Sequence, residues 1–152
     1  MSDETREERL NRELIELLNE LRVALPGVQM LFGFLLAVPF SQRFDSITTA
    51  QRHVYYATFI ATAFATIFFI APTAYHRVRF RQRDKEQLVQ TSSRLTIVGT
   101  AFLAVALAGA VFVVSDLLFR ATVTAIATAT VAAVLVWFWY GLPGYRRLRE
   151  SR

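Results

Sequence analysis

The chain has 152 residues, enough for one domain, and its 54% hydrophobic and 13% aromatic content exceeds that of an ordinary soluble domain. It has no cysteine, which excludes disulfides, thiol catalysis and thiolate metal sites. Its net charge of +5 does not indicate nucleic-acid binding, because no basic motif with interleaved aromatic residues lies outside the apolar segments.

The first 22 residues predict a cytoplasmic amphipathic helix. They contain seven acids and four arginines, and leucines at spacings of four, three and four form one stripe: Leu10, Leu14, Leu17 and Leu21. The stripe has three candidate partners: the lipid headgroup boundary, the same helix of a second subunit, or the cytoplasmic face of its own bundle. The acidic polar face disfavours the lipid surface, where Lys and Arg are usual, so packing against protein is favoured.

The first apolar segment, 23–40, is expected to act as the insertion signal, because the charged segment before it lacks the apolar core of a signal peptide. Pro26 has no amide hydrogen and its ring crowds the carbonyl of Arg22, so we expect a kink or break near residues 24–27. A single long helix is the alternative, since the leucine stripe continues in the same rhythm through Ala24, Val28, Leu31, Leu35 and Val38.

The start of this segment carries the candidate polar path or gate, formed by Glu16, Glu20, Arg22, Pro26 and Gln29. Gln29 is expected to bond the carbonyl groups freed by Pro26 or by a neighbouring helix. Glu16 and Glu20 share one helix face, so in an oligomer with this helix at its axis they would surround a vestibule and concentrate cations. The alternative for Glu20 and Arg22 is a solvated helix mouth, where both side chains reach water or headgroups.

Three further apolar segments, 54–75, 95–114 and 121–142, have the roughly 17 to 25 residues that a helix needs to cross a bilayer. Lys and Arg number 14 in the amino-terminal segment, the loop 76–94 and the tail 143–152, against three in the other two loops. This distribution predicts a four-span protein of the plasma membrane, the bacterial inner membrane, with both termini in the cytoplasm. The expected fold is all-α, a four-helix membrane bundle preceded by the amphipathic helix.

Several smaller patterns concern packing and surfaces. Alanines at steps of four are suited to close helix approach: Ala57, Ala61, Ala65, Ala121, Ala125 and Ala129. Basic residues of the loop are suited to lipid headgroups or a partner protein: Arg77, Arg79, Arg81, Arg83 and Lys85. Thr58, Thr62 and Thr66 are expected to bond carbonyl groups one turn back in their own helix. Asp116 predicts a turn or helix cap before the last segment.

The last three apolar segments contain no Asp, Glu, Lys, Arg or His, which disfavours a carboxylate-based antiporter. His53 and His76 flank the second segment at opposite surfaces, so they cannot share a metal. No nucleophile–base set, metal-spaced cluster or glycine-rich phosphate loop occurs, so we expect neither an enzyme nor a cofactor.

Three blocks of the sequence carry a resemblance to a known family: ELLNELRVALPGVQMLFGFLLAVPFSQRF, IAPTAYHRVRFRQRDKEQLV and WFWYGLPGYRR. From about residue 13 to residue 145 the chain resembles a family of small actinobacterial membrane proteins of unknown function, some of which are labelled sodium:proton antiporters. The resemblance implies a four-helix membrane fold and supplies no catalytic or transport residues.

These features together predict a homo-oligomeric membrane protein that acts as a conduit for small ions, with the region around Pro26 as its gate. The alternative is a non-transporting membrane subunit that binds a partner protein through its amphipathic helix and basic loop. A third prediction is a lipid-interacting protein that uses the basic segment 77–85.

Overall fold

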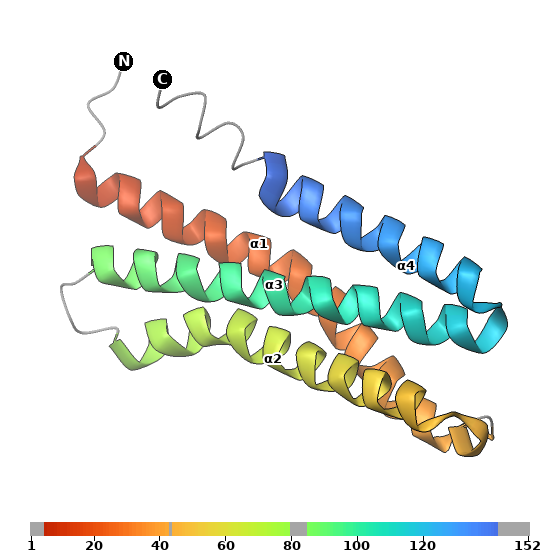
Figure 1. Cartoon of the computed structure of the whole chain (residues 1–152). Coiled ribbons are helices and arrows are strands. Elements are labelled where there is room, and N and C mark those ends of the chain that lie inside the picture. The colour runs from red at the N-terminus through yellow and green to blue at the C-terminus, as the bar shows by residue number, and fades with distance from the viewer. Residues whose placement is uncertain (1–4, 43, 80–84, 143–152) are drawn as a thin grey trace.

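The computed structural model describes residues 5–42, 44–79 and 85–142, and these residues form helices joined by short connections. The helices are α1 (Arg6–Ala37), η1 (Val38–Phe40), η2 (Phe44–Ser46), α2 (Thr49–Arg79), α3 (Lys85–Leu118), α4 (Ala121–Val136) and the π-helical η3 (Trp137–Gly141). No strand occurs in these ranges, so the all-α prediction is confirmed. Figure 1 shows α1 passing across α3 toward the start of α2, while α4 lies along α3. Helix α1 packs against α2 from Leu21 onward.

Helix α1 is a single helix of 32 residues that begins with a capping box. The Glu8 amide donates to Thr5 Oγ1 at 3.4 Å, and the Thr5 amide donates to Glu8 Oε2 at 2.9 Å. The helix continues through Pro26, so the kink or break expected near residues 24–27 is not a break. Pro26 lies on an exposed side of α1, where the carbonyl of Arg22 loses its helical donor without being buried in the core.

The leucine stripe explains why α1 stays continuous. Leu21 and Val28 are buried with Ala65 and Phe69 of α2, and Leu17 packs against this cluster. Further along, Leu35 is buried with Tyr55 and Val113, where Leu31 and Val38 join them. Of the three candidate partners for the stripe, the chain's own helices therefore cover its described length from Leu17 onward, and packing on one face holds α1 together across Pro26.

Helices α2 and α3 form the closest pair in the molecule. A methyl group added at Gly109 of α3 would lie 2.1 Å from Thr58 Oγ1, and one added at Gly99 would lie 2.7 Å from the Phe69 ring. Ala106 is buried between these two glycines. Small residues on α3 thus let α2 approach its backbone, which is the usual means of helix association where lipid gives no hydrophobic drive.

Helix α4 contacts α3 and no other of the α-helices described. Its packed side carries Thr124, which is 2% exposed, and Thr128, whose hydroxyl is buried. Large apolar side chains cover its outer sides, among them Ile126 and Val134. The described helices therefore form a four-helix arrangement in which α1, α2 and α3 contact one another and α4 is attached through α3.

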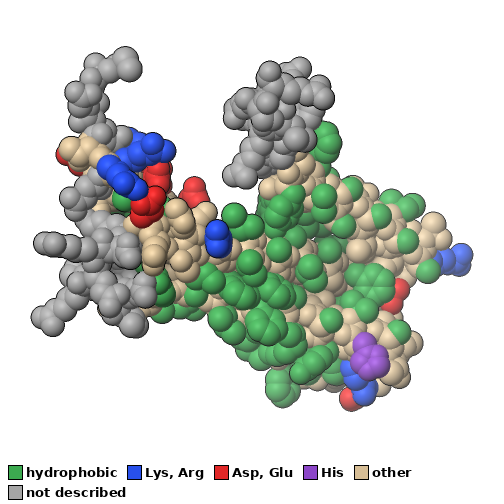
Figure 2. All heavy atoms as spheres, turned by 60° about the vertical axis from the view of Figure 1, so that its left-hand side comes forward, with side chains coloured by type: hydrophobic (Ala, Val, Ile, Leu, Met, Phe, Trp, Pro, Cys, Tyr) green, Lys and Arg blue, Asp and Glu red, His purple; other side chains and the backbone are tan. Residues whose placement is uncertain are grey.

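Each of the four long helical segments contains a stretch long and apolar enough to cross a membrane. Between 6% and 33% of the residues in these stretches are buried inside the chain, so most of their apolar surface faces outward. Figure 2 shows charged side chains gathered at the two ends of the molecule and hydrophobic side chains between them. A lipid environment suits such a surface, whereas water does not, and the chain is a membrane protein by this criterion.

Candidate functional site

The candidate polar path follows the outside of α1. Glu16, Glu20, Arg22, Pro26 and Gln29 are all exposed, on sides of the helix that the leucine stripe does not occupy. The structure therefore brings these residues together on one helix but not around a cavity inside the chain. Gln29 makes no hydrogen bond with any residue that the structure describes, so the bond expected between its amide and a freed carbonyl is absent.

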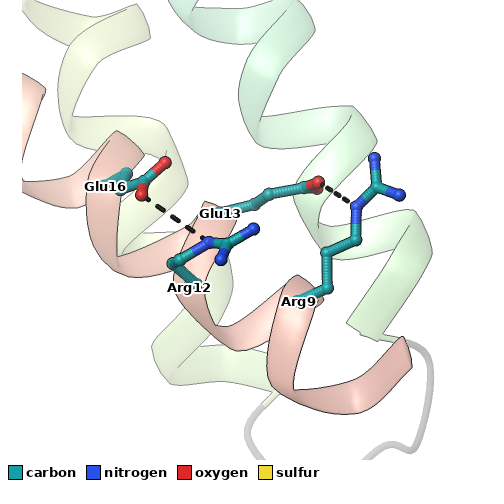
Figure 3. Close-up of polar contacts among 4 residues, drawn as sticks. All are labelled: Arg9, Arg12, Glu13 and Glu16. Carbon is teal, nitrogen blue, oxygen red and sulfur yellow. Dashed lines mark hydrogen bonds and ion pairs between the residues drawn. The ribbon is translucent and has the colours of Figure 1, made fainter. Parts of the chain in front are cut away.

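Ion pairs organise the first turns of α1, as Figure 3 shows. Arg9 Nε lies 2.9 Å from Glu13 Oε1, and Arg12 Nε lies 3.8 Å from Glu16 Oε1, each pair four residues apart. One candidate carboxylate of the path, Glu16, is thus partly neutralised by a neighbouring cation. Glu20 pairs with no cation among the described residues.

A second polar contact joins α1 to the start of α3. Arg6 forms an ion pair with Glu86, and a cavity of about 290 Å³ beside them is also lined by Arg9, Glu13 and Gln90. The amide and hydroxyl of Thr5 donate to Glu8 and hold its pKa below the ordinary value. The charged start of α1 is therefore both capped and fixed to α3.

The threonine hydroxyl groups of α2 donate hydrogen bonds to carbonyl groups of their own helix. Thr58 Oγ1 donates to the Val54 carbonyl at 2.7 Å, Thr62 to the Thr58 carbonyl at 2.8 Å, and Thr66 to the Thr62 carbonyl at 2.9 Å. This confirms the expected bonds one turn back. Because Thr58 and Thr62 are buried against the neighbouring helices, their stripe lines no open path.

The alanine stripes of α2 and α4 differ in burial. Ala61 and Ala65 are buried in α2, whereas Ala57 is exposed. Ala121, Ala125 and Ala129 are exposed, because α4 turns its Thr124 side toward α3. Among the basic residues of the loop, Arg77 is exposed near the end of α2, while residues 81 and 83 and the side chains of Arg79 and Lys85 lie outside the described part.

The opposite end of the molecule holds two polar contacts that sequence reasoning did not identify. Gln51 Nε2 donates to Asp116 Oδ2 at 2.6 Å and so joins α2 to α3, while Thr48 and Gln51 form a reciprocal cap for α2. Asp116 therefore lies within α3 and does not cap the last helix, whose N-cap is Arg120. The Thr-x-x-Gln spacing was a readable signal for the cap, but nothing local indicated the bond to Asp116.

Tyr55 is the most informative buried polar residue, and the sequence alone did not single it out. Its hydroxyl donates to the Leu35 carbonyl at 2.6 Å. Pro39, four residues after Leu35, has no amide hydrogen, so Tyr55 supplies the donor that the helix lacks at this point. Here a side chain does what Gln29 was expected to do near Pro26.

No metal-binding arrangement accompanies these contacts in the part of the chain that is described. No group of three or more His, Asp or Glu side chains there could hold a metal ion.

Comparison with known proteins places the chain in a family without assigning an activity. No curated protein and no solved structure matches it. The sequence profile of a family of unknown function, DUF6328, matches residues 3–143, which is nearly the whole chain. The chain therefore belongs to the family of unknown function DUF6328.

Proposed function

We propose that the chain forms a closed homo-oligomer in the membrane and that small cations pass along an axis between its copies, beside α1. The observation that carries this proposal is the position of Glu20, Arg22 and Gln29 on sides of α1 that α2 and α3 leave uncovered. Polar groups on the outside of a membrane helix call for a polar partner, and identical helices around an axis supply one.

Among the described residues, the interior of a single chain offers no comparable path. The clusters around Leu21 and Leu35 fill the contacts between the first three helices, and the Thr58 and Thr62 hydroxyls are bonded to their own backbone. A conduit built by this protein therefore has to lie between chains.

Glu20 and the backbone near Pro26 would act together at such an axis. A ring of Glu20 carboxylates would attract cations, since none of these is paired with a described cation within its own chain. Two residues later, the Arg22 carbonyl has lost its helical donor to Pro26 and is free to accept from water or contact a partly dehydrated ion. This arrangement makes the Pro26 region the gate of the proposed conduit.

Cation flux into liposomes containing the purified protein tests this proposal. We expect Glu20→Gln to reduce the flux several-fold, because it removes one charge per chain from the proposed axis. Glu13→Gln is the matched control: it removes the same charge from a half-buried position next to α3 and should change the flux much less.

Oligomeric mass in nanodiscs decides whether the axis exists. A closed assembly of three or more chains supports the proposal. A monomeric mass, or equal flux from liposomes with and without the protein, would overturn it.

A second candidate function is that of a non-transporting membrane subunit. The Arg6–Glu86 ion pair supports it, because fixing the start of α1 to α3 presents the cytoplasmic ends of both helices as one surface for a partner protein. This function predicts no flux, together with a second polypeptide that remains bound in mild detergent and is lost when Glu86→Lys breaks the ion pair.

A further inference from the structure

An apolar groove runs between the carboxyl ends of α1 and α3. Its volume is about 490 Å³; Phe34 and Val38 form one wall and Val114, Leu117 and Leu118 the other. Among the described residues that line it, Ser41 and Gln42 are the polar ones, and they lie at the end where α1 has stopped. The groove is thus apolar along its length and polar at one mouth.

Two features described above leave this groove open. Pro39 ends α1, and the bond from Tyr55 to the Leu35 carbonyl holds that end of α1 against α2. On the other side, α4 runs back along α3 and does not contact α1. Phe34 remains 61% exposed and Leu118 59% exposed as a result.

We propose that this groove binds one acyl chain of an anionic phospholipid, whose headgroup lies at the Ser41 and Gln42 mouth. A volume of about 490 Å³ with apolar walls and a few polar groups at one end is typical of a small-molecule site. An acyl chain is the apolar ligand present at this surface of a membrane protein. The inference depends on the membrane setting and does not depend on ion conduction.

Charge complementarity identifies the headgroup as anionic. Arg120 follows the groove residue Leu118 by two positions, is exposed, and forms no ion pair with a described carboxylate. A lipid phosphate at this end of α3 would offset the charge of Arg120. A second copy of the chain docked symmetrically on the groove would instead bring two Arg120 side chains toward the same interface, which is unfavourable.

Native mass spectrometry tests the site directly. The full-length protein is released from nanodiscs of equal parts phosphatidylglycerol and phosphatidylethanolamine with identical acyl chains. We expect one retained phospholipid per chain, mainly phosphatidylglycerol, and loss of this lipid in Val114→Trp, which fills the groove. Val105→Trp is the matched control, because Val105 is 59% exposed on α3 but does not line the groove, and it should retain the lipid.

Arg120→Gln tests recognition of the headgroup separately from binding of the acyl chain. We expect it to keep the retained lipid but to lower the preference for phosphatidylglycerol about fivefold, the factor expected from one cation near an anionic headgroup. Equal lipid retention by Val114→Trp and wild type would overturn the proposal. A wild-type chain that carries no lipid would overturn it as well, whether it is a monomer or is paired through this face.

Discussion

Pro39 and Tyr55 show how one side chain completes the backbone of a membrane helix. The Leu35 carbonyl has no helical donor because residue 39 is proline, and both Leu35 and Tyr55 are buried. In hydrocarbon an unsatisfied carbonyl costs several kcal/mol, since no water can reach it. The 2.6 Å bond from the Tyr55 hydroxyl removes this cost.

Tyr55→Phe should therefore destabilise the protein by about 1–3 kcal/mol, the cost of leaving a buried acceptor unpaired. Unfolding by denaturant in mixed micelles measures the loss. Tyr56→Phe is the matched control: Tyr56 is 61% exposed, so this substitution should leave the free energy of unfolding unchanged.

A second background sharpens this prediction. In Pro39→Ala the new amide at residue 39 can donate to the Leu35 carbonyl, so Tyr55→Phe should cost less there than in wild type. An equal cost in both backgrounds would contradict the role assigned to the hydroxyl.

At the scale of elements, the α2–α3 pair combines close contacts at two glycines with stacking of Phe64 and Phe68 on Phe102. Thr58 sits over Gly109, and Phe69 sits over Gly99, so each contact places a side chain of α2 against the backbone of α3. Dispersion contacts at this short range are what hold membrane helices together.

Gly109→Ala should consequently separate the two helices and cost about 1–3 kcal/mol, as overpacking of a tight core does. Thr58→Ala in the same chain should restore part of the loss, because it removes the hydroxyl and the methyl group nearest to the added carbon. Gly33→Ala is the control: apart from its own chain neighbours and the adjacent backbone of α1, nothing lies within 4 Å of its added carbon. Thermal unfolding in detergent compares the variants, and equal effects of Gly109→Ala and Gly33→Ala would contradict the close contact.

The elements also show which structural features the sequence predicts. The alternating spacing of four and three residues predicted one apolar face of α1 from Leu17 to Val38. The structure buries or half-buries the residues of this face. Of the predicted kink or break near Pro26, a break does not occur: α1 continues through Pro26, which lies on the exposed side of the helix. In α4 the alanine and threonine stripes have the same period, so periodicity alone could not choose the side that faces α3.

Contacts between distant residues account for most of what sequence reasoning missed. The bond from Tyr55 to Leu35 spans 20 positions and that from Gln51 to Asp116 spans 65. Neither leaves a local pattern, although Pro39 does indicate that the carbonyl four residues earlier needs another donor. The candidate path on α1 was visible as a set of polar residues, but its position outside the packed core was not.

At the scale of the whole molecule, the four long helices alternate in direction, so the start of α1, the end of α2 and the start of α3 share one end. The distribution of Lys and Arg, 14 against three, predicts that this end is cytoplasmic.

Cysteine labelling checks this orientation without interference, because the chain has no cysteine of its own. In intact cells, a membrane-impermeant maleimide should label Asp45→Cys, which lies at the far end. It should label Gln87→Cys, near the start of α3, only after the membrane is permeabilised. The reverse pattern would place both termini outside the cytoplasm.

The attachment of α4 to α3 alone also bears on how the protein is made. Both apolar clusters lie within the first three helices, so the ribosome synthesises every residue of these clusters before it translates α4. The nascent chain can thus fold its core while the fourth helix is still in the exit tunnel. Helix α4 then enters the bilayer last. It covers one side of α3 after the first three helices have packed together.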